Sequence, residues 1–190
     1  TNTTLLRRII NNEEFIIEET NVGKISNTQV AICYLKNVVN DKLVKEVKYR
    51  LANLGIDYLI SSGQLEQLIE DTNFSLPQLL SSERPDRVSS LILEGRVAIL
   101  VNGTPYALVA PAVLIDFLSS AEDRNLKFVF ADLLKMIRLL ALFITLLLPG
   151  LYIAVTTFHQ ELIPTELLFA IVASRSNVPF PIIFELLIME

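Results

Sequence analysis

The sequence predicts an α/β domain with a mixed sheet, in one unit or in two small subdomains, followed by α-helical membrane segments. Composition is the first observation that predicts this. The 190 residues are 52% hydrophobic and 19% charged, which is too apolar for a typical soluble domain and too charged for an all-membrane protein. The charges are also unevenly shared, because fifteen of the sixteen Lys and Arg residues and seventeen of the twenty-one Asp and Glu residues precede residue 139. This distribution indicates a soluble unit followed by a membrane unit, and neither is basic enough to suggest nucleic-acid binding.

Residues 139–158 form the run that predicts the membrane unit, because they contain no charged side chain. A helix that rises about 1.5 Å per residue needs roughly 20 apolar residues to cross a hydrocarbon core of about 30 Å. A core helix of a soluble protein is the alternative, but such helices normally keep a polar stripe. The only polar side-chain groups in this run belong to Thr145, Tyr152, Thr156 and Thr157.

The cations that flank this run predict its orientation. The first cation on its C-terminal side is Arg175. Four cations lie on its N-terminal side, namely Arg124, Lys127, Lys135 and Arg138. Because cytoplasmic flanks are enriched in Lys and Arg, we expect the soluble domain to lie in the cytoplasm. The single cysteine, Cys33, has no partner for an internal disulfide, which agrees with a reducing compartment.

Strand and helix signals alternate in the first half of the soluble part. Residues 15–17 and 29–35 are apolar, β-branched runs typical of strands. Residues 40–55 have the apolar spacing of a helix that ends at Gly55, and residues 56–60 read as a strand parallel to residues 29–35. A further helix is predicted around Leu65, Leu68 and Ile69.

The second half of the domain is predicted to contain a β-hairpin between two helices. Pro85 suits the first turn of a helix that ends at Gly95. Residues 96–101 and 104–110 flank Asn102-Gly103, a pair typical of a type I′ turn in which both residues have positive φ. A short helix from Pro111 to Leu118 is expected next, and residues 127–138 have the pattern of an amphipathic helix that leads into the apolar run.

Sites of chemistry are harder to find in this sequence. It has no Walker A loop, no GxGxxG after a strand, no HExxH and no GxSxG. His159 and Glu161 form an HxE, but the zinc deaminases that use this pattern also need a PCxxC. We therefore predict no catalytic, cofactor-binding or metal site and no enzymatic activity. We interpret Arg84, Asp86 and Arg87, together with Asn102 and Gly103, as structural motifs of the domain.

Pro149-Gly150 interrupts the apolar run near its middle, so we expect the helix to bend or break there. The freed carbonyl group then needs neighbouring helices or water as a partner. The hinge or pore residues that we predict are Pro149, Gly150, Thr156, Thr157, His159 and Glu161. A kinked membrane anchor is the alternative to a channel-lining hinge.

Several strings of this sequence resemble the A subunits of bacterial spore germinant receptors. They are SGQLEQLIEDTNFSLPQLL, SSERPDRVSSLILEGRVAILVNGTPYALVAPAVLIDFLSSAED, RLLALFITLLLPGLYIAVTTFHQELIPTELL and NVPFPIIFELLIME. The likeness covers roughly residues 28–190, with Asn102 where the family usually has Asp and Glu166 where it often has Pro. Family members carry further spanning helices and a cytoplasmic tail, so the resemblance implies that this chain is truncated.

The resemblance implies a receptor subunit of the spore inner membrane, multi-pass in its full length, that takes part in nutrient-triggered germination. Its implied partners are a transporter-like B subunit, a lipoprotein C subunit, membrane lipid and further copies of itself, with which it would form or gate an ion-release channel. The alternative is a membrane-anchored module that senses a small ligand or docks a partner. The expected organisation is an N-terminal extension with the first strand (1–27), the α/β domain (28–125), a juxtamembrane helix (126–138) and a membrane region (139–190) whose first span is 139–158.

Overall fold

The computed structural model describes residues 2–71, 77–120, 123 and 126–158, and the single positions 164, 166, 169, 170 and 173. The chain divides into two compact units, residues 1–125 and residues 126–190. The first unit is an α/β domain, and the second contains one long apolar helix, as the sequence predicts.

The first unit is built on one five-stranded sheet whose strand order is β1-β2-β4-β5-β3. Every pair of neighbouring strands is antiparallel. The elements in chain order are α1 (Asn2–Ile9), β1 (Phe15–Val22), β2 (Thr28–Leu35), α2 (Asp41–Ala52), α3 (Ser62–Ile69), β3 (Leu80–Ser82), α4 (Pro85–Leu93), β4 (Val97–Val101), β5 (Ala107–Ala110) and α5 (Leu114–Leu118).

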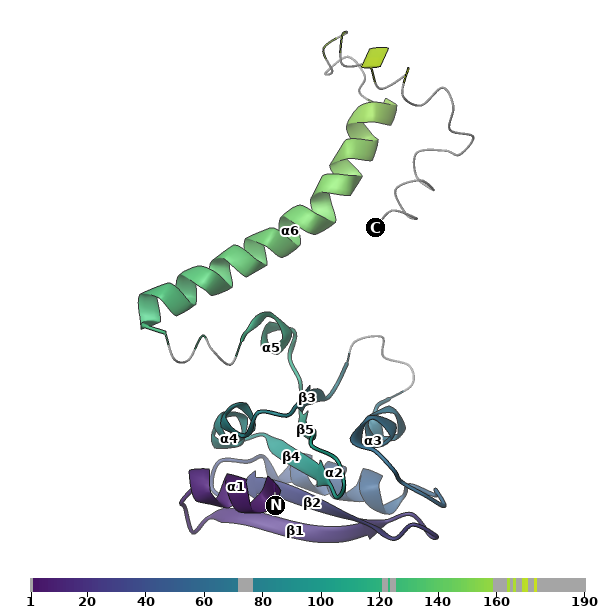
Figure 1. The fold of residues 1–190 in the computed structure, drawn as a ribbon, viewed down its shortest axis with the longest axis vertical. Helices are drawn as coiled ribbons and strands as arrows, with labels where there is room; N and C mark the ends of the chain where they lie inside the picture. Colours follow the sequence, from purple (N-terminus) through teal and green to yellow (C-terminus); the bar gives the residue numbers. More distant parts are fainter. Residues whose placement is uncertain are drawn as a thin grey trace. The chain divides into compact units, whose positions relative to one another are not determined.

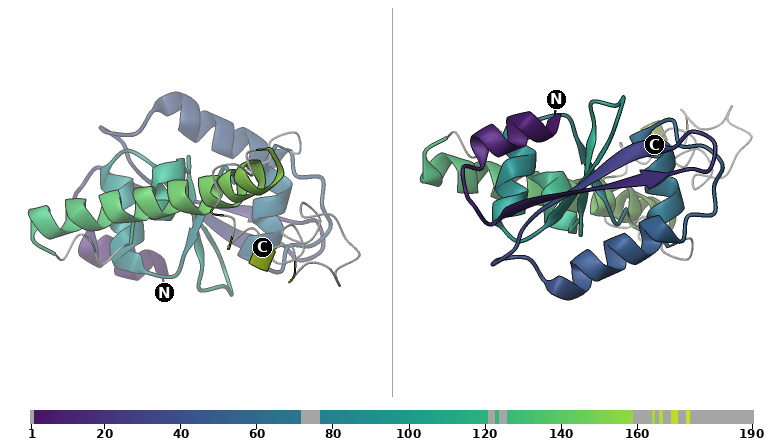
Figure 2. Two further views of the ribbon diagram at one scale, coloured as in Figure 1. Left: turned by 90° about the horizontal axis from the view of Figure 1, so that it is seen from above. Right: turned by 90° about the horizontal axis from the view of Figure 1, so that it is seen from below.

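The sheet has helices on both faces, which explains why its central strands are apolar throughout. Along β4, Val97, Ile99 and Val101 face one core together with α2 and α3. The alternate residues Ala98 and Leu100 face a second core together with α1 and α4. Successive side chains of a strand point to opposite faces, so a strand covered on both faces needs apolar residues at every position. Figures 1 and 2 show the helices placed on the two sides of the sheet.

The predicted strand at residues 56–60 is wrong. Both sides of β2 are already occupied, by β1 and by β4, so no parallel partner can pair with it. Residues 56–60 instead run beside the β1–β2 turn, where the carbonyl of Asp57 accepts hydrogen bonds from the amides of Ile25 and Ser26. Only Leu59 is buried in this segment, with 2% exposure.

The predicted hairpin of β4 and β5 is confirmed, but its turn is not of type I′. Ile99 pairs with Leu108 and Leu100 with Ala107, so the loop is longer than two residues. Gly103 has a positive φ of 89°, whereas Asn102 does not. The amide of Asn102 donates to the carbonyl of Gln29, which keeps Asn102 in line with β4 beside β2.

Two further elements differ from the prediction at the ends of the domain. Helix α1 was not predicted, yet its Leu6 is 2% exposed and the following Ile10 is 3% exposed in the second core. Residues 1–27 therefore belong to the domain. The last helix begins at Leu114 and not at Pro111, because the carboxylate of Asp116 accepts the amide of Val113 and caps the helix there.

The second unit contains α6 (Phe128–Phe158), which is one continuous helix that includes Pro149. The predicted juxtamembrane helix and the predicted span are thus parts of the same helix. Figure 1 shows that α6 changes direction in its second half, the half that contains Pro149. The helix bends without breaking.

Candidate functional site

The most constrained polar cluster of the domain joins α4, β4 and α5. Arg96, which directly precedes β4, pairs with Asp116 of α5 through its two terminal guanidinium nitrogens, and the contact from Arg96 Nη2 to Asp116 Oδ1 is 2.9 Å. Their side chains are only 15% and 8% exposed. Arg96 Nη1 also donates to the carbonyl of Pro111 at 3.1 Å. This buried pair holds the segment after β5 against the start of β4.

Arg87 of α4 strengthens the same corner from the other side. Its Nη2 donates to the carbonyl of Asp116 at 2.6 Å and to the carbonyl of Ser119 at 3.3 Å. A cation near the C-terminal carbonyls of a helix is favourable because it satisfies groups that lack intrahelical partners. We call Arg87, Arg96 and Asp116 the arginine clamp, and it fixes the last helix of the domain before the chain continues to α6.

Electrostatics explain why Asp116 stays ionised in the clamp. Burial by itself raises the pKa of its carboxyl group. The hydrogen bonds from Arg96 and from the Val113 amide, with the charges of Arg96 and Arg87, outweigh burial and leave the pKa below its ordinary value. The pKa of Arg96 is raised, first by its hydrogen bond to Asp116. Both groups therefore carry their charges at neutral pH.

The other predicted domain motifs lie at the surface. Arg84 and Asp86 form an ion pair of 2.9 Å whose side chains are 47% and 53% exposed, next to Pro85 at the start of α4. Asn102 and Gly103 form the β4–β5 turn on another part of the domain. Of the five predicted motif residues, only Arg87 contributes to the clamp.

Sequence reasoning missed Arg96 and Asp116 as functional candidates. Asp116 is the only charged residue between Arg96 and Glu122. A lone carboxylate in such an apolar stretch must be either exposed or paired, because an unpaired buried charge is very costly. That pattern was the signal available in the sequence, but it does not identify Arg96 as the partner.

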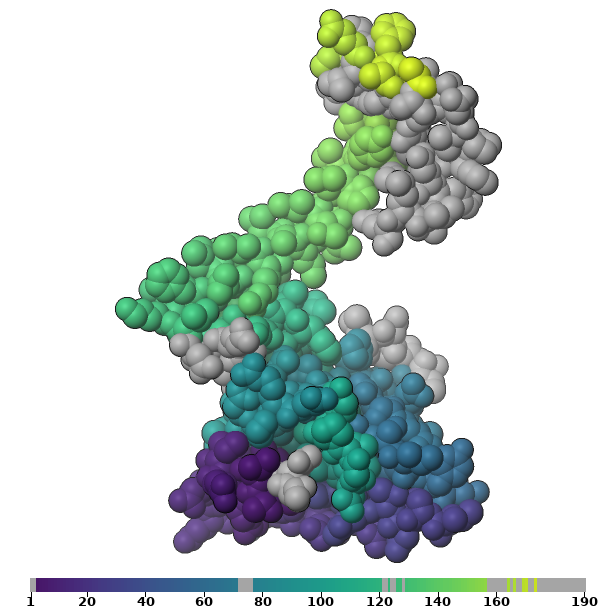
Figure 3. All heavy atoms as spheres, in the orientation of Figure 1, coloured from purple at the N-terminus to yellow at the C-terminus, as the bar shows by residue number. Residues whose placement is uncertain are grey.

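A polar hollow of about 400 Å³ lies at the opposite end of β4. Its polar residues come from α1, β1, β2 and the β4–β5 loop, and Glu19 accepts a hydrogen bond of 2.7 Å from Gln29. Figure 3 shows this loop at the surface of the domain beside α1. The residues that line the hollow are Thr3, Glu19, Gln29, Ala31, Leu100, Val101, Asn102, Gly103, Thr104 and Pro105. Among the residues that the structure describes, no cluster of His, Cys, Asp and Glu could hold a metal ion.

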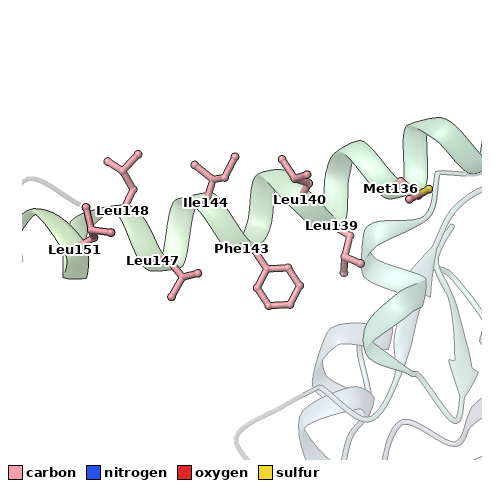
Figure 4. Close-up of a pocket in the computed structure, with 8 residues that line it drawn as sticks. All are labelled: Met136, Leu139, Leu140, Phe143, Ile144, Leu147, Leu148 and Leu151. Atoms are coloured by element: carbon pink, nitrogen blue, oxygen red, sulfur yellow. The ribbon is translucent and has the colours of Figure 1, made fainter.

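From Leu139 onward, helix α6 has no charged side chain and is apolar on all sides rather than along one stripe. Within it, Val129–Thr156 is long and apolar enough to cross a membrane, with a mean hydropathy of 2.3 in its most apolar window. Figure 4 shows Leu140, Ile144 and Leu148 along one edge of the helix, and Phe143 and Leu147 along another. These five side chains are between 49% and 65% exposed. A helix of this kind needs an apolar environment around it.

The predicted hinge residues are only partly described. Pro149 lacks the amide hydrogen that would bond the carbonyl of Thr145, and a side chain at Gly150 would meet no atom within 4 Å. Thr145 and Thr156 donate their hydroxyl groups to the carbonyls of Ala141 and Tyr152, at 2.8 and 2.7 Å, a bond that often bends helices. The side chain of Thr157, and His159 and Glu161, lie outside the described residues.

The domain and the helix define a protein with an α/β unit and a segment able to cross a membrane. Residues 1–190 match the family described as Bacillus/Clostridium GerA spore germination protein. Spore germination protein KA of Bacillus subtilis (strain 168) is 45% identical over 191 residues, which cover 100% of this chain and 35% of that protein. Spore germination protein B1 of the same organism is 46% identical over 190 residues, which cover 100% of this chain and 39% of that protein.

A solved structure also matches, with 43% identity and a TM-score of 0.48 over 60% of this chain and 90% of the other. It is the N-terminal domain of the A subunit of the Bacillus megaterium spore germinant receptor GerK3. The chain belongs to the GerA family of spore germination proteins. It spans well under half of the length of the two Bacillus subtilis relatives.

Proposed function

We propose that this chain is part of a membrane subunit of a spore germinant receptor, and that it acts in nutrient-triggered germination without being an enzyme. Family membership supports the role in germination. The observation that carries the membrane role is α6, where the 28 residues from Val129 to Thr156 are long and apolar enough to cross a membrane and carry no charge from Leu139 onward. At about 1.5 Å per residue they extend about 42 Å, more than a hydrocarbon core of about 30 Å.

The proposed location is the inner membrane of the spore, with the α/β domain in the cytoplasm. Lys127, Lys135 and Arg138 lie at the N-terminal part of α6, and Arg124 precedes it, whereas the next cation is Arg175. This asymmetry is the one that keeps a flank on the cytoplasmic side. The buried, unpaired Cys33 agrees with a reducing compartment.

We further propose that several copies of the subunit assemble, together with a transporter-like B subunit and a lipoprotein C subunit, and that α6 lines or gates an ion-release channel. Pro149 supports this role, because it leaves the carbonyl of Thr145 without its helical partner. In hydrocarbon such a carbonyl needs a donor from a neighbouring helix or from water in a pore. Lipid acyl chains have no hydrogen-bond donor, and neither do the exposed side chains that precede Pro149, which are Leu146, Leu147 and Leu148.

Replacing Pro149 with alanine in the full-length receptor tests the hinge. Alanine restores the backbone hydrogen bond to Thr145 and straightens α6, so we expect nutrient-triggered ion release to slow while protein level and receptor assembly stay normal. The matched control is Leu147→Ala, which shortens an exposed side chain and leaves the backbone unchanged. Normal germination and normal ion release in the Pro149 variant would leave α6 as a kinked anchor only.

The polar hollow gives one observation in favour of a second function, a small-ligand sensor. A ligand that binds the folded domain raises its thermal stability. Stabilisation of residues 1–125 by a soluble nutrient, lost on Glu19→Ala, would favour that function.

A further inference from the structure

Helix α5 is turned the opposite way from a helix at the surface of a soluble domain. Its only charged residue, Asp116, is 6% exposed and lies in the arginine clamp. Four bulky apolar side chains in and just before the helix face outward, with exposures between 46% and 63%: Val113, Leu114, Ile115 and Phe117. In water the apolar side of a helix is normally buried and the charged side exposed.

The clamp fixes this orientation. Rotating α5 to bury its apolar side chains would break the pair between Arg96 and Asp116 and the bonds from Arg87 to the carbonyls of Asp116 and Ser119. It would also remove the cap that Asp116 gives to the amide of Val113. The outward face is therefore held in place by the polar contacts behind it, and a contiguous exposed apolar patch usually marks an interaction site.

The covalent path to α6 indicates what covers this patch. Leu118 ends α5 and Val129 begins the candidate span, so ten residues lie between them and eleven Cα–Cα steps join them. At about 3.3–3.6 Å per residue this path reaches at most about 40 Å. It is shortened because the Ser120 amide donates a hydrogen bond to the carboxylate of Asp123. If α6 spans the membrane, α5 is confined to the neighbourhood of that membrane's surface.

The two charged residues of the connecting segment whose exposure the structure describes favour the same environment. Asp123 is turned inward, with 4% exposure, whereas Lys127 is exposed. An exposed cation on the covalent path from an apolar patch to a membrane span suits the boundary between anionic lipid headgroups and acyl chains, where interfacial helices bury their apolar side. A second copy of the chain or another protein would need a complementary surface of its own. The connection to α6, in contrast, already keeps α5 near the bilayer surface.

We propose that α5 is an interfacial membrane contact, with Val113, Leu114, Ile115 and Phe117 inserted at the headgroup level of the membrane that α6 crosses. The proposal rests on the proposed function, because it requires α6 to span. In this arrangement the arginine clamp ties the sheet of the domain to the membrane surface. Movement of the domain relative to the bilayer would then have to break either the lipid contact of α5 or the clamp.

Depth-dependent fluorescence quenching in the full-length subunit tests this contact. The protein is reconstituted in vesicles of phosphatidylcholine and phosphatidylglycerol, and an environment-sensitive fluorophore is attached at Phe117→Cys. Tyr49→Cys on α2, where the native side chain is 67% exposed, is the control in water. Leu147→Cys on α6 is the control in the membrane. The native Cys33 does not react, because it is fully buried and burial raises the pKa of its thiol to about 12.

We expect the probe at 117 to be quenched by lipids labelled near the headgroup, the probe at 147 by lipids labelled along the acyl chain, and the probe at 49 by neither. Adding Leu114→Ser and Ile115→Ser should abolish the quenching at 117. These substitutions leave the core intact because both positions are exposed. If 147 is quenched and 117 behaves like 49, the contact is overturned while the span stands. If 147 is not quenched, the proposed function fails. Oxidative cross-linking of 117 between copies would show that a second copy covers α5 and would also overturn the proposal.

Discussion

Replacing Asp116 with alanine should lower the free energy of unfolding of residues 1–125 by about 3 kcal/mol, because removing one partner leaves the other charge buried and unpaired. The charge that loses its partner is that of Arg96, whose side chain is 15% exposed. Glu94 lies 3.6 Å from Arg96 and offsets a little of the cost, since its side chain is half-exposed. Urea unfolding of the isolated domain, followed by circular dichroism, measures the change.

The matched control for this prediction is Arg84→Ala, which removes the Arg84–Asp86 ion pair at the start of α4. That pair is about half exposed, and exposed pairs contribute about 0–1 kcal/mol. Equal losses for the two variants would contradict the assignment of the clamp as the buried polar cluster that fixes α5. The isolated domain is suitable for the measurement because both of its hydrophobic cores lie within residues 1–125.

Acid should reduce the difference between the wild-type domain and the Asp116 variant. The pKa of Asp116 is lowered in the folded state, so its stabilising contribution is complete above its unfolded pKa of about 3.9. It is lost as the pH falls through the lower folded pKa, where the carboxylate is protonated. Urea titrations from pH 7 down to about pH 3 follow this loss, which the variant cannot show.

Gly95→Ala is the second substitution with a large expected effect, a loss of about 3 kcal/mol. Gly95 has a φ of +93°, and a Cβ there would lie 2.8 Å from the carbonyl oxygen of Val38. The left-handed backbone costs a side-chain-bearing residue about 1–3 kcal/mol. The clash adds to that cost, because the Val38 amide donates a hydrogen bond to the carbonyl of Leu35 in the turn after β2, and this turn must move.

Gly103→Ala separates the two causes. Gly103 has a similar φ of +89°, but a Cβ there would meet nothing within 4 Å. We therefore expect a loss of about 1 kcal/mol from backbone strain alone. If Gly95→Ala lowers the free energy of unfolding no more than Gly103→Ala does, the end of α4 and the β2–α2 turn are not closely packed. The same urea measurement serves both variants.

The comparison of sequence and structure shows which features local patterns can predict. The hairpin of β4 and β5 was predictable because two apolar runs flank Asn102-Gly103, and α2 and α4 because apolar spacing and capping residues agree. The prediction of a parallel strand at residues 56–60 was wrong because the position beside β2 is taken by β4, which lies almost seventy residues after β2 along the chain. Such pairing is a long-range property that no short segment contains.

Two features of the candidate site were not predictable for related reasons. The partner of Asp116 lies twenty residues away in the sequence, in a different element, so spacing alone could not identify it. The turn type at Asn102 depends on a hydrogen bond to Gln29 of β2, which again comes from the tertiary fold. Helix α1 was missed because eight residues are too few to show a clear helical period.

Cation flux through the full-length subunit in liposomes tests the central claim most directly. Vesicles loaded with a potassium salt receive the full-length subunit, alone and with the B and C subunits of its receptor, and insertion of α6 is verified by quenching at position 147. We expect potassium release above that of protein-free vesicles, and slower release for Pro149→Ala than for Leu147→Ala. Release no faster than from protein-free vesicles in every combination, with α6 inserted, would contradict a channel role for this subunit.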